Sequence, residues 1–129
     1  MSAERILIVD DEDSIREVVS SMLTSSSFVC TQAQSGKEAL ALLQSGEEFE
    51  LMLSDMMMPV MDGAATITVI QRINPSVRII AASGIDSQDT KDRVVTTGVK
   101  HFLAKPFTAE TLLLLMREVL DTPVSSTPR

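Results

Sequence analysis

Polar residues that could handle a phosphoryl group follow the short apolar runs of this 129-residue sequence. Asp10 and Asp11 follow the first run, Asp55 the third, Ser83 the fourth and Lys105 the fifth. A carboxylate can act as a nucleophile, while an ammonium group and a hydroxyl can bind the anionic oxygens of a phosphoryl group. Together these residue types favour in-line transfer of a phosphoryl group to a carboxylate.

A divalent cation is the expected companion of the three aspartates. The carboxyl ends of parallel strands meet at one edge of a sheet, where ligand sites form. Three carboxylates gathered there repel one another, and a hard cation with oxygen ligands relieves the repulsion. We therefore predict a Mg²⁺ site, which Mn²⁺ could also fill, at Asp10, Asp11 and Asp55. Asp55 ends the central strand opposite the other two, which makes it the predicted acceptor.

Each of these residues has a simpler interpretation when it is taken alone. An aspartate after a strand is usually a helix cap or a loop residue, which is what we expect of Asp13. A single lysine at a strand end is usually solvated, and Ser83-Gly84 alone would indicate a turn. The whole set is much harder to explain by chance, because its members occupy the same end of successive strands.

The alternation of two sequence patterns predicts the fold. Short apolar runs that begin at Ile6, Phe28, Leu51, Val77 and Val99 are typical of parallel strands buried on both faces. Helical periodicity follows each run: Ile15–Leu23, Gly36–Leu43, Ala64–Ile73, a segment from Ser87 or Asp89 to Gly98, and a helix that Thr108 caps. In the first of these the i, i+3, i+4 pattern places Ile15, Val18, Val19, Met22 and Leu23 on one apolar face. The order is (βα)5, which predicts an α/β fold with a doubly wound, five-stranded parallel sheet. Strand order 2-1-3-4-5 would place the first and third strands side by side.

Composition limits the possible partners. The length fits one domain, expected over residues 4–121, and the Pro/Ser/Thr-rich residues 122–129 are expected to be a disordered tail. A formal net charge of −7, without Trp or Tyr, argues against direct contact with nucleic acid or an anionic membrane. No apolar run approaches the roughly 18 residues that span a membrane, and the first residues do not resemble a signal peptide. The single Cys30 cannot form an internal disulfide, and we expect a cytoplasmic protein.

Four motifs, in this order, resemble those of the receiver domain of bacterial two-component response regulators. They are Ile6-Leu7-Ile8-Val9-Asp10-Asp11-Glu12, Asp55-Met56-Met57-Met58-Pro59 with Met61-Asp62-Gly63, Ala82-Ser83-Gly84, and Lys105-Pro106-Phe107. The resemblance covers about residues 4–121. It implies a flavodoxin-like fold and a phosphoacceptor that catalyses only its own phosphorylation and dephosphorylation, so we expect a switch rather than an enzyme.

The resemblance also implies a role for each residue at a matching position. Asp55 would be the phosphoacceptor. Asp11, Asp55 and the backbone carbonyl of Met57 would bind Mg²⁺, with Asp10 acting close by through water. Lys105 would pair with the acceptor carboxylate or with the phosphoryl group.

The remaining matches concern the response to phosphorylation. The Ser83 hydroxyl would move toward a phosphoryl oxygen, and Phe102 would be the aromatic side chain that rotates inward when it does. The face formed by helix four, strand five and helix five would change as a result. Receivers of this kind also have a cis peptide, which here would precede Pro106.

The implied donor is a histidine kinase or a histidine phosphotransfer domain, and a homodimer or an effector could use the switching face. A receiver fused behind a sensor histidine kinase and a free-standing regulator both fit. Two other classes remain as alternatives. A pseudo-receiver interaction module would have lost Asp55, Asp11 or Lys105, and all three are present. An aspartyl-phosphate phosphatase of the haloacid-dehalogenase type would need a second aspartate two residues after the nucleophile, where this chain has Met57.

Three residues are expected to set the lifetime of the phosphoryl group. Hydrolysis needs an in-line water, and a polar side chain beside the phosphoryl group can orient one. Met57 and Ile85, the two positions best placed to do this, are apolar, whereas Gly84 leaves the group open to solvent. We expect shielding by Met57 and Ile85 to win, and therefore slow loss of the phosphoryl group.

Overall fold

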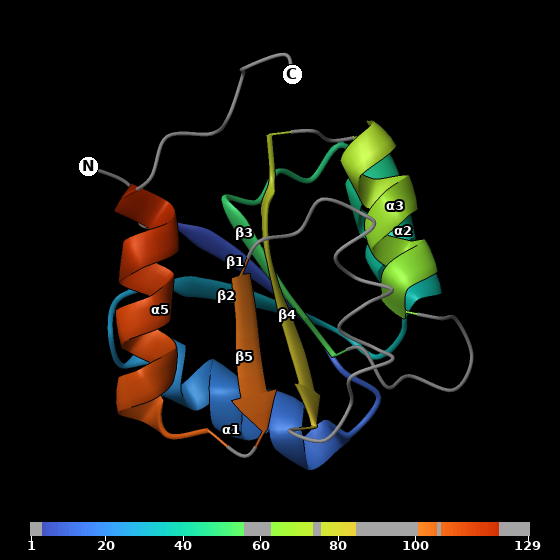
Figure 1. Cartoon of the computed structure of the whole chain (residues 1–129). Helices are drawn as coiled ribbons and strands as arrows, with labels where there is room; N and C mark the ends of the chain where they lie inside the picture. Colours follow the sequence, from blue (N-terminus) through green and yellow to red (C-terminus); the bar gives the residue numbers. More distant parts are fainter. Residues whose placement is uncertain (1–3, 56–62, 74–75, 85–100, 106, 122–129) are drawn as a thin grey trace.

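The computed structural model describes residues 4–55, 63–73, 76–84, 101–105 and 107–121. Figure 1 shows a central sheet with helices packed against both of its faces. The strands are β1 (Arg5–Val9), β2 (Val29–Ala33), β3 (Leu51–Asp55), β4 (Arg78–Gly84) and β5 (His101–Lys105). The helices are α1 (Asp13–Thr24), α2 (Gly36–Gln44), α3 (Gly63–Ile73) and α5 (Ala109–Asp121). The helix predicted to end at Gly98 and the tail at 122–129 lie outside the described residues.

The five strands form one parallel sheet in the order β2-β1-β3-β4-β5, which confirms the predicted fold class. All five residues of β3 are buried, as expected for a central strand covered on both faces. The register places Val9 of β1 opposite Ser54 of β3, so the residues that follow β1 lie beside the end of β3. The predicted meeting of Asp10 and Asp55 is therefore built into the sheet.

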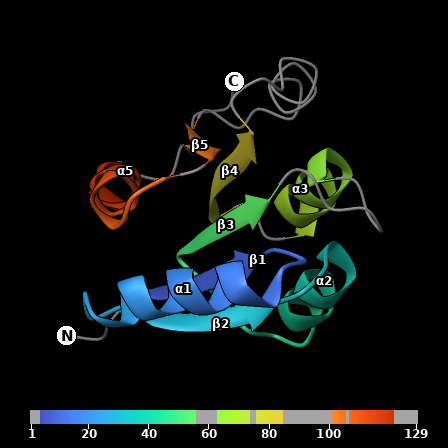
Figure 2. The ribbon, with the colours of Figure 1, turned by 90° about the horizontal axis from the view of Figure 1, so that it is seen from below.

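Two hydrophobic clusters hold the helices against the sheet. Figure 2 shows α1 and α5 on one face of the sheet and α2 and α3 on the other. One cluster joins the sheet to α2 and α3 through Ala39, Leu43 and Ile70. The other joins it to α1 and α5, and includes Leu23 and Met116, both fully buried. Alternate residues along β1, β3 and β4 supply the two clusters, because successive side chains of a strand point to opposite faces.

Hydroxyl caps mark the start of two helices. The Glu38 amide donates to Ser35 Oγ at the start of α2, at 3.1 Å. The Thr111 amide donates to Thr108 Oγ1 in the same way before α5, also at 3.1 Å, as the sequence predicts. These bonds satisfy amides that a helix leaves without intrahelical partners.

Helix α1 differs from the sequence prediction at two positions. Asp13 is its first residue rather than its cap, because Glu12 occupies the N-cap position. Val18, which was expected on the apolar face, has 52% of its surface exposed, while Val19 and Leu23 are buried. At about 100° per residue, Val18 lies about 120° around the helix from the direction midway between those two residues. The i, i+3, i+4 pattern was therefore wider than the face that the sheet covers.

Candidate functional site

Two buried carboxylates share one ammonium group at the carboxyl edge of the sheet. Asp10 follows β1 and Asp55 ends β3, and they are only 3% and 4% exposed. Lys105, the last residue of β5, places its Nζ 3.2 Å from Asp10 Oδ2 and 3.3 Å from Asp55 Oδ1. The structure thus brings these three predicted residues together from three separate strands.

The lysine reaches its partners past a small side chain. Strand β4 lies between β5 and β3, so Lys105 must cross it to reach Asp55. Ala82 of β4, the register partner of Asp55, lines the same small cavity as Lys105 and Asp55. Its single methyl group leaves room for the lysine stem.

The charges of the aspartates control the protonation of Lys105. Burial is the largest single influence on the pKa of Lys105 and acts to lower it, because an ammonium group loses hydration. The carboxylates of Asp55 and Asp10 act in the opposite direction, and together they raise the pKa above the usual 10.5. Lys105 is therefore a cation throughout the physiological pH range.

Asp10 is held at both of its carboxylate oxygens. Its Oδ1 accepts a hydrogen bond from the Glu12 amide at 3.0 Å, while its Oδ2 accepts from Lys105. Its own amide donates to Ala33 O at 3.1 Å, which extends the pairing of β1 with β2 by one residue. The direct ion pair with Lys105 was not predicted, since Asp10 was expected only to serve the metal site.

The donor set of the three aspartates suits a hard divalent cation. Asp10, Asp11 and Asp55 each offer a carboxylate oxygen, and these three atoms lie within 4.8 Å of one another. Asp11 is exposed, whereas the other two are buried, so an ion bound there would be reached from solvent on one side. All-oxygen ligation with room for waters fits Mg²⁺ or Mn²⁺ better than a soft metal.

The other predicted site residues are placed only in part. Ser83 and Gly84 belong to β4, where they lie opposite Ala104 and Lys105 in the register with β5. Phe102 is partly buried in β5 and packs against the cluster beneath α2 and α3. Three further candidates lie outside the described residues: Met57, Ile85 and Pro106.

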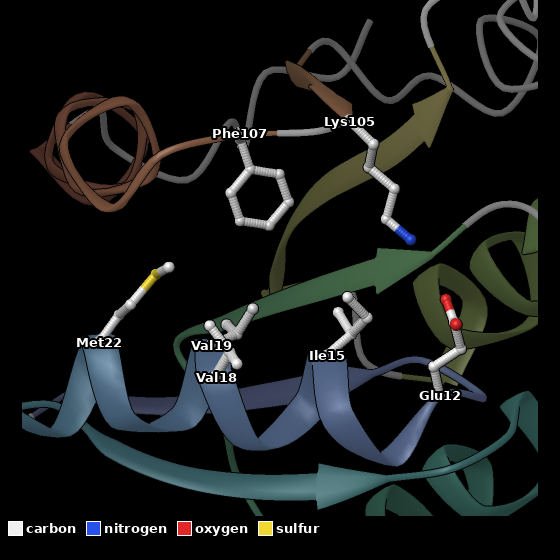
Figure 3. A pocket seen from close by; sticks show the side chains of 7 residues that line it. All are labelled: Glu12, Ile15, Val18, Val19, Met22, Lys105 and Phe107. Carbon is white, nitrogen blue, oxygen red and sulfur yellow. The ribbon is translucent and has the colours of Figure 1, made fainter.

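An apolar pocket of about 360 Å³ adjoins the acidic edge, between α1 and the segment that follows β5. Figure 3 shows Lys105 and Phe107 facing the helix across it. Its lining residues are Glu12, Ile15, Val18, Val19, Met22, Lys105 and Phe107. Lys105 therefore belongs to both the polar site and the apolar pocket. Val18, which is exposed, lines the same pocket.

Two contacts of the acidic edge escaped the sequence analysis. The Glu12 amide binds Asp10, and the Arg16 guanidinium donates from Nη1 to Asp10 O at 2.7 Å. The signal for Arg16 was present, because an arginine three residues after Asp13 is well placed for an ion pair in the first turn of a helix. Nothing in that spacing indicates that the same guanidinium also reaches back to the end of β1.

The sequence of this chain is similar to those of known proteins, which indicates its family. The profile of the response regulator receiver domain matches residues 6–117. The chemotaxis protein CheY of Bacillus subtilis is 32% identical over 120 residues, which are 92% of this chain and 99% of that protein. The sensor kinase CckA of Brucella abortus is 32% identical over 118 residues, which are 90% of this chain but only 12% of the kinase.

Solved structures agree with these sequence matches. The chemotaxis response regulator CheY4 of Vibrio cholerae superposes with a TM-score of 0.84 at 32% identity, covering 92% of this chain and 99% of that one. A CheY-like receiver domain protein from Methanospirillum hungatei gives a TM-score of 0.88 at 28% identity, covering 93% and 95%. Among the described residues, no helix is long and apolar enough to cross a membrane.

Proposed function

Because the chain belongs to the response regulator receiver domain family, whose members are phosphoacceptor switches of two-component signalling, we propose that Asp55 is its phosphoacceptor and that Mg²⁺ assists the transfer. The donor that we propose is the phosphohistidine of a histidine kinase or of a histidine phosphotransfer domain in the cytoplasm. The chain spans nearly all of one relative and 12% of another, so a free-standing regulator and a receiver within a larger kinase both remain candidates.

The observation that carries the proposal is the setting of the Asp55 carboxylate. It is 4% exposed, it lies 3.3 Å from Lys105 Nζ, and one of its oxygens lies within 4.8 Å of oxygens from Asp10 and Asp11. Of the three aspartates, Asp10 and Asp11 both follow β1, and Asp11 is exposed beside the sheet. Asp55 alone ends the central strand β3, between β1 and β4.

The proposed reaction needs little from the protein beyond position and charge. An Asp55 oxygen forms a bond to phosphorus as the bond from phosphorus to the donor imidazole nitrogen breaks, and the imidazole keeps that electron pair. Mg²⁺ bound by Asp10, Asp11 and Asp55 would supply positive charge for the phosphoryl oxygens. Lys105 is the second positive charge. Its Nζ already lies between the carboxylates of Asp10 and Asp55, so it can transfer its hydrogen bonds from them to a phosphoryl group on Asp55.

The switch that we propose rests on Ser83 and Phe102, with the face made by the segment before β5, β5 itself and α5. A ligand biases a two-state element only if it contacts the two states differently. A Ser83 hydroxyl drawn to a new phosphoryl oxygen would supply that difference, and Phe102, which is opposite Ala81, lies two register positions from the Ser83 pair. A homodimer or an effector is the expected reader of this face.

Acetyl phosphate labelling with Mg²⁺, followed by intact mass, tests the assignment of the acceptor. The wild type should gain one labile phosphoryl group, and Asp55→Asn should gain none, because an amide oxygen is a poor nucleophile. Asp13→Asn is the matched control, since it makes the same chemical change at a side chain that is 83% exposed. Full labelling of Asp55→Asn would contradict the assignment, and an unlabelled wild type would favour the pseudo-receiver alternative.

A further inference from the structure

Arg16 ties three segments together beside the acidic edge. It lies in the first turn of α1, and only 11% of its side chain is exposed. Its Nη1 donates to Asp10 O at 2.7 Å, and its Nε donates to Gln32 Oε1 on β2 at 3.3 Å. Its Nη2 forms an ion pair with the Asp13 carboxylate. One guanidinium thus joins the ends of β1 and β2 to the start of α1.

The contact with Asp10 O acts on the peptide that carries Asp11. That carbonyl lies in the same planar peptide unit as the amide nitrogen and Cα of Asp11, so fixing the oxygen restricts the positions of these two backbone atoms. The Asp11 carboxylate itself is exposed and, within the described part of the chain, has no hydrogen bond or ion pair. Its position among the three aspartates therefore depends on its backbone.

Building on the proposed Mg²⁺ site, we infer that Arg16 is a positioning residue, which holds the Asp10–Asp11 peptide so that the Asp11 carboxylate can reach the cation. Mutation of a residue that orients a metal ligand without touching the metal commonly lowers metal affinity about 10- to 100-fold. Since Arg16 binds the backbone beside the ligand rather than the ligand carboxylate, we expect an effect at the low end of this range, about 10-fold.

Lysine cannot take over this role, although it carries the same charge. Arginine presents five donors in a planar fork, which lets one side chain bind in three directions. The ammonium group of lysine is a compact point charge on a flexible four-carbon stem, so it could keep the ion pair with Asp13 but not all three contacts. Replacement by lysine therefore separates geometry from charge.

Two rival roles for Arg16 predict different results. If its charge alone matters, removal of a cation beside three aspartates should strengthen metal binding, and Arg16→Lys should behave as the wild type. If Arg16 only packs α1 against the sheet, its variants should unfold more easily but bind metal normally once folded. Positioning is the one role that predicts weaker binding in both Arg16→Lys and Arg16→Met.

Direct binding of Mn²⁺ to the full chain, measured from the electron paramagnetic resonance signal of the free ion, tests the inference. The chain has no Trp or Tyr, so intrinsic fluorescence offers little signal. We expect Arg16→Lys and Arg16→Met to bind Mn²⁺ about 10-fold more weakly than the wild type, at a temperature where circular dichroism shows each to be folded. Asp13→Ala, which removes only the carboxylate partner of Arg16, should bind as the wild type does.

The possible outcomes separate this inference from the proposed function. Wild-type affinity in both Arg16 variants, or tighter binding by Arg16→Met alone, overturns the positioning role and leaves the metal site intact. A wild type that does not bind Mn²⁺, or whose affinity survives Asp11→Ala, overturns the metal site and the inference together.

If neither Arg16 variant folds, the wild type provides the test: its Arg16 Nε signal in a ¹⁵N spectrum should shift with Mg²⁺ at the same half-saturation as the Asp11 amide. An Arg16 signal that stays still while the Asp11 amide moves overturns the inference.

Discussion

Replacing Lys105 with methionine removes a charge from the centre of the site while keeping most of the apolar stem. The variant leaves Asp10 and Asp55, which are 3% and 4% exposed, without the ammonium group that lies 3.2 and 3.3 Å from their oxygens. Because two nearby carboxylates then face each other without compensation, we expect the folded state to lose stability near neutral pH.

The size of the loss can be bounded in two ways. At an effective dielectric constant of about 20, each of the two charge pairs contributes about 5 kcal/mol of attraction, most of which the desolvation of the ions offsets. Loss of one partner from a buried pair usually costs about 3–5 kcal/mol. An upper limit comes from protonation, since neutralising an ordinary aspartate at pH 7, about 3 units above its pKa, costs about 4 kcal/mol. We therefore expect the free energy of unfolding to fall by about 3 kcal/mol at pH 7.

The loss should depend on pH in a definite direction. In Lys105→Met, the folded state binds a proton that relieves the repulsion, so its stability rises relative to the wild type as the pH falls toward 4. In the wild type, the pKa of Lys105 is raised in the folded state, so its stabilising effect is complete below about 10.5 and is lost as the pH rises through the higher folded value. The gap between the two proteins should thus be widest from pH 7 to 10 and narrow on both sides.

Urea unfolding followed by far-ultraviolet circular dichroism at pH 4.5, 7, 9 and 11 measures this gap. Lys37→Met is the matched control, because the same substitution on an exposed lysine should change stability by less than about 0.5 kcal/mol at every pH. A loss of equal size at all four pH values would point to packing rather than charge. An unchanged free energy of unfolding at pH 7 would refute the view that the ammonium group compensates the two aspartates.

Further predictions concern the metal, a helix cap and the lifetime of the phosphoryl group. Millimolar Mg²⁺ should raise the melting temperature, because an ion held by all three aspartates would bind only the folded chain, and Asp11→Ala should flatten that rise in a thermal scan. Ser35→Ala should lower the free energy of unfolding in urea by about 1 kcal/mol, since the Glu38 amide loses its acceptor. Met57→Asn combined with Ile85→Glu should speed loss of the phosphoryl group about 10-fold, as followed by intact mass over time, if an oriented water lowers the barrier by about 1.4 kcal/mol. A decay rate equal to that of the parent would show that these two positions do not set the lifetime.

The sheet and its polar edge could be predicted because both depend on patterns that are local in the sequence. A buried parallel strand is a short apolar run, and the residue that ends the run must lie at the carboxyl edge. Asp10, Asp55 and Lys105 each end such a run, so their meeting follows once the strand order is known. The strand order was inferred from the fold class, because 2-1-3-4-5 is a common order in doubly wound sheets.

The pairing of particular atoms could not be predicted in the same way. Lys105 binds Asp10 as well as Asp55 because its Nζ lies at nearly the same distance from both carboxylates, 3.2 and 3.3 Å. The spacing of residues in the sequence does not determine distances this finely. The contact of Arg16 with Asp10 O was missed because arginine has several donors, and the sequence indicated only its i, i+3 partner Asp13. The exposure of Val18 depends on how far β5 and the chain after it extend over α1, which only the packed structure shows.

The position of Lys105 in the last strand of the sheet also has a consequence for synthesis of the chain. Lys105 follows Asp55, the later of the two aspartates, by 50 residues, so a ribosome that adds about 5–20 residues per second makes it about 2.5–10 s later. During this interval the growing chain already carries both buried carboxylates but lacks their only shared cation among the described residues. An emerging chain with β1 and β3 in contact therefore carries an uncompensated acidic pair, which opposes early closure of the sheet. Arrival of β5 completes the sheet and the proposed acceptor site in one step, so a chain cut short before β5 should have neither.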